Sequence, residues 1–381
     1  MPIGGLSVST EALRANARAL RALVAPARAA FVVKSNAYGH GLVETALAIE
    51  GLATLICVFD LDEAIALRDG GITAPILVLG PVPIDALDDA LAAKVEIALW
   101  DYREYAMAVA SVARKRATRF AVHVKVDTGV RRFGLSVGDA PDAIEEYLKR
   151  PEIEIAGIFS HLAAAEELDS PFTTTQNERF ESVLAQVRPL FAQREIAPMT
   201  HIAASAAGML WPQTRLDMVR FGIALYGLWP SPLTREAMEG TGLTLRPALS
   251  FHSTLVAERS VRAGEPIGYG CTLHAPHEMR VGLVPFGYAD GVPRALSNKG
   301  AFAVAGARAP IVGRVCMNVT LLDITHIPAA RPGSHVTLIG SDGAASVTAD
   351  DWADWAETIN YEIVARLPAG LPRIAIPGNP E

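Results

Sequence analysis

The sequence predicts an α/β protein, with an N-terminal (β/α)8 barrel of the TIM type followed by a mostly antiparallel β domain. In the first part, apolar strand-like runs alternate with amphipathic stretches rich in Ala and Leu. That alternation is typical of a parallel sheet covered by helices on both faces. Beyond about residue 230 the apolar runs become short and are broken by Gly and Pro, which is typical of antiparallel strands.

Strand-like runs recur eight times between about residue 28 and about residue 228. In order they read AAFVVK, ATLICVFD, APILVLG, VEIALW, FAVHVKVD, IEIAGIFS, MTHIAAS and MVRFGIALYG. Helix-like stretches such as REYAMAVASVARKR lie between them. Eight such units predict a closed barrel. The competing arrangement, an open doubly wound sheet, usually has GxGxxG after its first strand, and SNAYGHG lacks that spacing.

These patterns divide the chain into a barrel domain, residues 1–232, and a β-rich domain, residues 233–381. The segment SPLTREAMEGTGLTLRP is the predicted linker, and FHSTLVAERSV, RVGLVPFG, APIVGRVCM and HVTLIG are predicted strands beyond it. The opening SVSTEALRANARALRALV predicts a strand that leads into a capped helix. That strand, within residues 1–9, is a candidate to join the β-rich domain.

Composition narrows the function classes. The chain has 34 Lys and Arg against 41 Asp and Glu, a net charge of −7. With no basic run, a nucleic-acid partner is not expected. No apolar run is long enough to span a bilayer and no signal peptide is visible, so we expect no membrane association. The three cysteines are far apart, which fits a reducing cytoplasm.

Polar residues follow the predicted strands at their carboxyl ends, where barrel enzymes keep their chemistry. They are Lys34, Asp127 with Thr128 and Gly129, His161, Ser205, and Arg220 with Gly222 and Ile223. Each has an ordinary alternative: a rim lysine, a turn, a core histidine or a helix N-cap. Together they predict a phosphate held by Ser205, Gly222 and Ile223. A phosphate opposite a lysine suggests a pyridoxal phosphate Schiff base.

Six motifs in order make the whole chain resemble the alanine racemase family of fold-type III pyridoxal phosphate enzymes. They are VVKSNAYGHG, KVDTGVRRFG, RFGIALYG, IGYGCTL, FGYADGVPRALSNKG and GRVCMN. The resemblance implies racemisation of alanine, with pyridoxal 5'-phosphate as cofactor and no metal. It also implies a cytoplasmic homodimer with shared active sites and a role in D-alanine biosynthesis.

The resemblance gives roles to the matching residues. Lys34 would bind the cofactor and act as one catalytic base, and the partner subunit's Tyr269 would act as the other. The further cofactor contacts would be Tyr38, His161, Ser205, Arg220, Gly222 and Ile223. Arg132 and the Met317 N–H would bind the substrate carboxylate. Lys125, at a position that can be carbamylated in the family, would support the site together with His201 and Tyr288.

Four positions differ from the family pattern. Ala204 replaces an Asn, Asn318 replaces an Asp, and Arg131 occupies a position that is commonly small. Ala369 or one of its neighbours stands where some members carry a second gate tyrosine. Loss of the large aromatic side chain would widen the entrance to the site. This predicts the alternative function, a racemase that acts on serine or on amino acids with larger side chains. The other explanation of the four differences is neutral drift. The remaining competing functions are an aldolase or decarboxylase on the same cofactor, a non-catalytic cofactor carrier, and a sugar-phosphate barrel enzyme.

Overall fold

The structure is a computed structural model that describes residues 4–100 and 103–378. The chain forms two compact units. The barrel unit comprises Arg14–Ser35 and Leu42–Arg246, and the β-rich unit comprises Met1–Leu13, Asn36–Gly41 and Pro247–Glu381. The outer limits of the two predicted domains, residues 1–3 and 379–381, lie outside the described residues.

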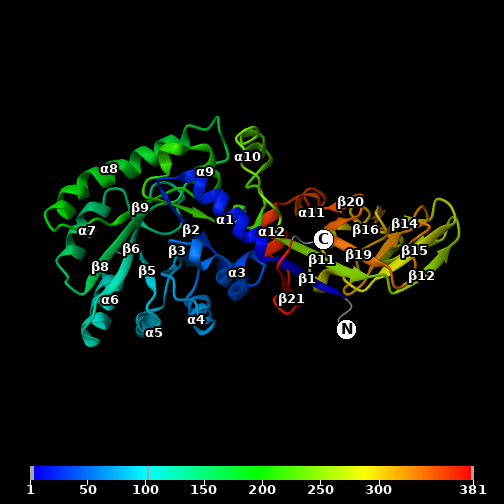
Figure 1. Cartoon of the computed structure of the whole chain (residues 1–381), viewed down its shortest axis with the longest axis horizontal. Coiled ribbons are helices and arrows are strands. Elements are labelled where there is room, and N and C mark those ends of the chain that lie inside the picture. Colours follow the sequence, from blue (N-terminus) through cyan, green and yellow to red (C-terminus); the bar gives the residue numbers. More distant parts are fainter. Residues whose placement is uncertain (1–3, 101–102, 379–381) are drawn as a thin grey trace. The chain divides into compact units, whose positions relative to one another are not determined.

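Eight parallel strands form the core of the barrel unit (Figure 1). They are β2 (Arg28–Val32), β3 (Leu55–Val58), β4 (Ile76–Val78), β5 (Glu96–Leu99), β6 (Phe120–Asp127), β8 (Ile153–Phe159), β9 (Met199–His201) and β10 (Met218–Phe221). Strand β10 pairs with β2, and a parallel bridge between Ala204 and Arg220 brings β9 to β10. The ring is therefore nearly closed, which confirms the predicted barrel.

Helices surround the ring of strands (Figure 1). They are α1 (Thr10–Val24), α3 (Leu42–Ile49), α4 (Leu61–Asp69), α5 (Leu87–Ala92), α6 (Glu104–Lys115), α7 (Ala140–Leu148), α8 (Phe172–Ala192) and α9 (Ser205–Leu210). Helix α6 is an example of how these helices pack. Its residues Tyr105, Val109 and Ala113 recur at a spacing of four and are all buried, so they form one apolar face of the helix. None of the helices within the described ranges is long and apolar enough to cross a membrane.

The β-rich unit is mainly antiparallel, as predicted. Its larger sheet contains β1 (Gly4–Ser9), β11 (Leu249–Thr254), β16 (Ala301–Val304), β17 (Ala307–Pro310), β19 (His335–Asp342), β20 (Ala345–Val347) and β21 (Arg373–Ile376). The smaller sheet contains β12 (Ala257–Val261), β15 (Met279–Val284) and β18 (Thr320–Asp323), and β13 (Pro266–Ile267) pairs with β14 (Leu273–His274). Two helices, α11 (Ala349–Ala356) and α12 (Asn360–Ala365), complete it. Strand β1 pairs with β11 and β21.

The segment predicted as a linker has structure of its own. It contains α10 (Pro232–Ala237), whose N-cap Ser231 accepts a hydrogen bond from the Thr234 N–H at 3.1 Å. The barrel unit ends within the segment, at Arg246.

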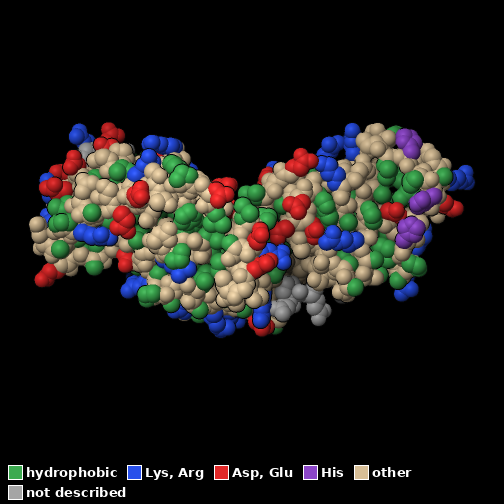
Figure 2. Space-filling model, turned by 90° about the horizontal axis from the view of Figure 1, so that it is seen from above, with side chains coloured by type: hydrophobic (Ala, Val, Ile, Leu, Met, Phe, Trp, Pro, Cys, Tyr) green, Lys and Arg blue, Asp and Glu red, His purple; other side chains and the backbone are tan. Residues whose placement is uncertain are grey.

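On the face drawn in Figure 2, acidic and basic side chains are interspersed.

Candidate active site

Lys34 begins a left-handed turn directly after strand β2. The turn, α2 (Lys34–Tyr38), has four successive residues, 35–38, with φ between 51° and 55°. For residues other than glycine this conformation costs about 1–2 kcal/mol each. Strain of this kind persists only where surrounding structure holds it, and it clusters at functional sites. The turn therefore favours a functional lysine over a rim lysine.

Gly39 allows the end of this turn to pack closely. Its φ is 81°, and a Cβ there would lie 1.9 Å from the carbonyl oxygen of Val364. The Gly41 N–H closes the turn by donating to the Asn36 carbonyl at 3.0 Å. A side chain at residue 39 would collide with the backbone of Val364, so packing requires Gly39, the first glycine of SNAYGHG.

The amine of Lys34 lies in surroundings that favour its neutral form. Burial is the main cause that lowers the pKa of Lys34, and Arg132 lowers it further, while Glu63 opposes the shift. The Nζ lies 5.9 Å from the centre of the Phe59 ring. A neutral amine is the form that attacks a carbonyl carbon.

Arg220 presents a buried guanidinium at the carboxyl end of β10. Its Nη1 donates to His201 Nδ1 at 2.6 Å. Its Nη2 donates to the carbonyl oxygens of Ser160 at 2.8 Å and Ile202 at 3.2 Å. Burial lowers the pKa of Arg220 to about 10, so the group stays charged at neutral pH. These acceptors hold the guanidinium in one orientation.

His161 is neutral and lies among cations. Burial, followed by Arg220, Arg132, Lys125 and Lys34, lowers the pKa of His161 to about 3. Arg220 Nη2 lies 3.4 Å from His161 Nδ1. Because an arginine can only donate, Nδ1 is the acceptor and Nε2 carries the proton. The structure thus brings five predicted site residues into one cationic region, which suits a bound anion.

Lys125 lies on β6 and its side chain is buried. Its Nζ lies 5.5 Å and 5.4 Å from the ring centres of Phe133 and Phe159. Burial, followed by Arg132 and Arg220, lowers the pKa of Lys125 to about 8. A substantial fraction of this amine is therefore neutral just above neutral pH.

The Asp-Thr-Gly motif forms a turn that leads to Arg132. Asp127 Oδ1 accepts hydrogen bonds from the N–H groups of Gly129 at 2.8 Å and Arg131 at 3.1 Å. Thr128 Oγ1 lies 2.9 Å from Ser160 Oγ, which joins the turn to the residue after β8. The motif is thus a turn, and it also positions a cation next to the site.

Ser205 does not cap helix α9, contrary to the ordinary alternative. The N-cap is Ala204, in extended conformation, and Ser205 is the first helical residue. Its Oγ instead accepts a hydrogen bond from the Gly222 N–H at 3.0 Å. Gly222 precedes a short 3-10 helix (Ile223–Tyr226), whose first N–H groups have no partner within the helix. The three predicted phosphate-binding residues therefore lie together.

Three predicted site residues beyond the linker, in the β-rich unit, are exposed. Tyr269 is 71% exposed and lies between Gly268 and Gly270, both with positive φ. Tyr288 and Met317 are also exposed, and they lie on two joined loops. The Tyr288 N–H donates to the Cys316 carbonyl at 3.0 Å. A Cβ on Gly287 would lie 2.2 Å from that same carbonyl oxygen, so glycine permits the close approach of the two loops.

Residues that the sequence analysis did not single out take part in the same networks. His123 Nδ1 lies 2.8 Å from His201 Nε2, and His123 Nε2 lies 2.7 Å from Glu96 Oε2. The period of two along a strand places His123 on the same face as Lys125, and this signal was available in FAVHVKVD. Tyr361 was also missed, and its ring centre lies 6.3 Å from that of Tyr38.

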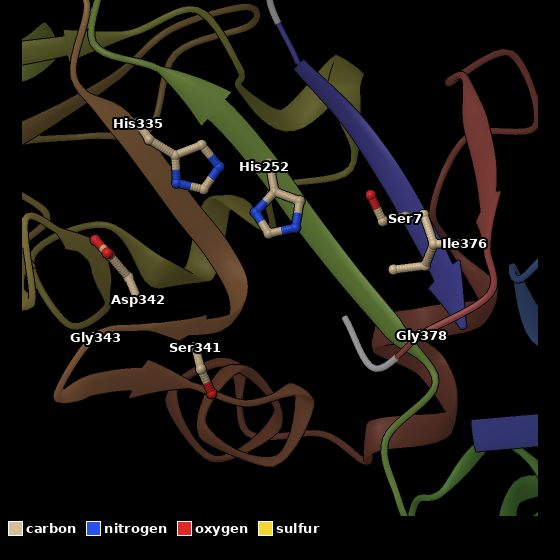
Figure 3. A pocket seen from close by; sticks show the side chains of 8 residues that line it. All are labelled: Ser7, His252, His335, Ser341, Asp342, Gly343, Ile376 and Gly378. Carbon is tan, nitrogen blue, oxygen red and sulfur yellow. The ribbon is translucent and has the colours of Figure 1, made fainter. Parts of the chain in front are cut away.

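The β-rich unit also contains an open pocket of about 580 Å³ (Figure 3). It is lined by Ser7, His252, His335, Ser341, Asp342, Gly343, Ile376 and Gly378. Burial and His335 lower the pKa of His252 to about 4, against an opposing effect of Asp342. None of the predicted site residues lines this pocket. Within the part of the chain that is described, no group of three or more His, Cys, Asp or Glu is placed to hold a metal ion.

Comparison with known proteins identifies relatives over nearly the whole chain. The family model described as the alanine racemase N-terminal domain matches residues 8–230, and the one described as the C-terminal domain matches residues 248–375. The alanine racemase of Desulforamulus reducens is 38% identical over 372 residues, covering 97% of this chain and 98% of that protein. The alanine racemase of a Nostoc species is 34% identical over 375 residues, covering 97% and 95%.

Solved structures agree with these sequence matches. The alanine racemase from D-cycloserine-producing Streptomyces lavendulae has a TM-score of 0.90 and 32% identity, covering 98% of this chain and 97% of that chain. The enzyme from Bacillus anthracis, solved with bound L-Ala-P, has a TM-score of 0.88 and 31% identity, covering 100% and 97%.

Proposed function

Because the chain belongs to the alanine racemase family of isomerases, we propose that it interconverts L- and D-alanine with pyridoxal 5'-phosphate as cofactor and two catalytic bases. The observation that carries the proposal is the cationic region itself. In it, a lysine with a lowered pKa and a fixed buried arginine act on one neutral histidine. Such a region suits a cofactor with a phosphate and an amino acid with a carboxylate.

The residues present fit that cofactor. When bound, it withdraws electrons from the substrate's α-carbon and so weakens the bond to the α-proton. Lys34 would hold its aldehyde carbon. Arg220, which can only donate, would face the pyridine nitrogen and leave it unprotonated. Tyr38 and Ser205, with the N–H groups of Gly222 and Ile223, would hold the phosphate.

Racemisation needs a base on each face of the α-carbon, because the proton leaves one face and a proton returns to the other. Lys34 would move the proton on one face, and the partner subunit's Tyr269 would move it on the other. A tyrosine with a pKa near 10 is a weak base unless cations favour its phenolate. Arg132 supplies such a cation, and His161 Nε2–H would donate to the phenolate oxygen. The exposure of Tyr269 within its own chain supports a homodimer with shared sites.

The remaining residues would bind the substrate or support the site. Arg132 and the Met317 N–H would bind the substrate carboxylate. A carbamate on Lys125 would replace one cation by an anion that orients Arg132, and the lowered pKa of Lys125 favours the neutral amine that reacts with carbon dioxide. His201 would hold Arg220, and Tyr288 would support the loop that carries Met317.

The proposed biological role is D-alanine supply in the cytoplasm. The three cysteines are free in the structure, which fits a reducing compartment. Cys57 is fully buried, and burial raises the pKa of its thiol to about 12, so it does not serve as a nucleophile.

Chiral analysis of the cofactor-loaded protein incubated separately with L-alanine, L-serine and L-lysine tests the proposal. We expect D-alanine as the main product. Comparable D-serine or D-lysine would favour the broader racemase, with Asn318 and Ala369 as the first positions to examine. Bound cofactor without any D-product would overturn the two-base assignment and favour an aldolase.

A further inference from the structure

A chain of hydrogen bonds runs through the barrel from Arg220 to Glu96. Arg220 Nη1 contacts His201 Nδ1 at 2.6 Å, and His201 Nε2 contacts His123 Nδ1 at 2.8 Å. His123 Nε2 then contacts Glu96 Oε2 at 2.7 Å. Arg220 lies near the carboxyl end of β10, whereas Glu96 is the first residue of β5. The network therefore links the candidate site to the opposite end of the barrel.

The chemistry of the two ends determines every proton in the network. Arg220 can only donate, so His201 Nδ1 accepts and the proton of this imidazole is on Nε2. His201 Nε2–H therefore donates to His123 Nδ1, and the proton of His123 is on Nε2. That N–H donates to the carboxylate of Glu96. With a proton on the wrong nitrogen of either histidine, two N–H groups or two lone pairs would face each other.

The fold makes room for His123. A Cβ at residue 157, on the neighbouring strand β8, would lie 2.3 Å from His123 Nδ1. The pairing of β6 with β8 also shifts register between Val122 and His123. A glycine and a shift of register at the same point indicate that the sheet accommodates the imidazole.

Arg220 and Glu96 are the charged groups at the two ends of the network. Among the residues described, Arg220 forms no ion pair, and its polar partners are imidazole nitrogens and carbonyl oxygens. Both groups act on the buried thiol of Cys57, whose pKa Glu96 raises and Arg220 lowers. The two charged groups therefore act on the same buried side chain of the barrel core.

We propose that Glu96 is a positioning residue, which locks His123 and His201 in the tautomers that receive and orient the guanidinium of Arg220. The effect on the reaction rests on the proposed function, in which Arg220 faces the cofactor. Arg220 imposes this arrangement from one end of the network and Glu96 from the other, so that without the carboxylate only Arg220 opposes a proton on His123 Nδ1. His201 can then turn an N–H toward Arg220, and the guanidinium loses its fixed orientation.

Three variants test this proposal. Glu96→Ala removes the acceptor, whereas Glu96→Gln removes the charge but keeps an oxygen that can accept from His123. Glu152→Gln is the matched control, because Glu152 lies at the same end of the barrel and pairs with Arg114 at 2.6 Å. Circular dichroism and thermal unfolding establish that each variant folds.

The first readout is the tautomer of each histidine, from imidazole ¹⁵N chemical shifts in the cofactor-free protein. We expect protonated Nε2 on both rings in the unchanged protein, in Glu96→Gln and in the control, and mixed tautomers in Glu96→Ala. Unchanged shifts in Glu96→Ala would overturn the proposal. This readout is independent of activity, so it stands even if the unchanged protein makes no D-alanine and the proposed function fails.

The second readout comes from the enzyme loaded with pyridoxal 5'-phosphate and consists of the absorption maximum of the bound cofactor and the kinetics with L-alanine. In Glu96→Ala we expect a shifted absorption maximum of the bound cofactor and a kcat for L-alanine lower by about tenfold or more, the scale seen when a partner that orients an imidazole is lost. KM should change little, because Glu96 is remote from the substrate. An equal effect in Glu152→Gln, or the same kcat in Glu96→Ala as in the unchanged enzyme, would contradict the positioning role.

Discussion

The two units hold their candidate residues in opposite ways. In the barrel, Arg220 is only 4% exposed, and the hydrogen bonds that it donates to His201, Ser160 and Ile202 fix its orientation. In the β-rich unit, Tyr269 is 71% exposed. Its backbone is shaped by the flanking glycines, but its ring is not enclosed by this chain.

The difference indicates which parts of the chemistry one chain can prepare by itself. Buried groups gain strong electrostatic interactions, and their pKa values shift, as for Lys34 and Lys125. The exposed ring of Tyr269 has no such enclosure within its own chain. In the proposed mechanism, one chain therefore prepares the barrel for the cofactor, whereas the second base requires surroundings that a second chain would supply.

The largest expected effect is that of Lys34→Ala, which removes the prepared amine. Racemisation of L-alanine should fall by about 10⁴-fold or more, because a base and the covalent hold on the cofactor are lost together. Chiral chromatography measures the rate and absorbance measures bound cofactor. The exposed Lys149→Ala should leave both unchanged, and appreciable activity in Lys34→Ala would remove this lysine from the mechanism.

Tyr269→Phe should reduce racemisation by about 10²–10⁴-fold, because it removes one acid–base group. Mixing it with Lys34→Ala after dissociation and reassociation sharpens the comparison between units. If each site takes its lysine from one subunit and its tyrosine from the other, every mixed dimer carries one intact site and one site with both defects. Random reassociation makes about half of all dimers mixed. Activity should then return to about a quarter of the unchanged enzyme. No recovery, with mixed dimers shown by native mass spectrometry, would place both bases on the same chain.

Lys125→Met tests the buried cation of the barrel through stability. In carbon dioxide-free buffer, Lys125 has a folded pKa of about 8 against the ordinary 10.5. The folded state therefore binds fewer protons than the unfolded state between these values. The destabilising contribution of the protonated Lys125 is therefore present in full below about pH 8. It is lost as the pH increases to 10.5, so the free energy of unfolding rises over this range.

We expect Lys125→Met to raise the free energy of unfolding at pH 7 by about 1–3 kcal/mol and to lose this pH-dependent contribution, while activity falls. Urea titrations at pH 7.5 and 9.5 measure both effects, with the exposed Lys115→Met as control. A pH dependence identical to that of the unchanged protein would show that Lys125 is not the source.

The barrel was predictable because several of its strands, among them β3, β4 and β10, are buried along their whole length. Runs such as ATLICVFD are then continuously apolar, and the residues of β3 are all buried. The left-handed turn after Lys34 was not predictable, since its φ values occur at Ser, Asn, Ala and Tyr. None of these is a glycine, and their conformation is imposed by packing.

The candidate site was predictable where a residue follows a strand and not where contacts cross the barrel. Lys34, His161 and Arg220 could be found from strand ends alone. Ser205 was predicted to hold a phosphate with Gly222 and Ile223, but its hydrogen bond from the Gly222 N–H depends on tertiary structure and could not be predicted. Glu96 and His123 lie on the neighbouring strands β5 and β6, but the contact of His123 with His201 on β9 depends on the tertiary structure of the barrel.

The smallest expected effect tests the loop that carries Met317 in the β-rich unit. Asn318 Nδ2 donates to Asp290 Oδ2 at 3.2 Å, and the same oxygen accepts from the Gly287 N–H at 2.9 Å. Asn318→Asp places a second negative charge there and should lower the free energy of unfolding by about 0.5–1 kcal/mol. The double variant with Asp290→Asn exchanges donor and acceptor and should recover most of this loss. Equal stability of all three proteins in urea would show that this contact does not hold the loop, so that the exposed side of the proposed site depends on a partner for its order as well as for its chemistry.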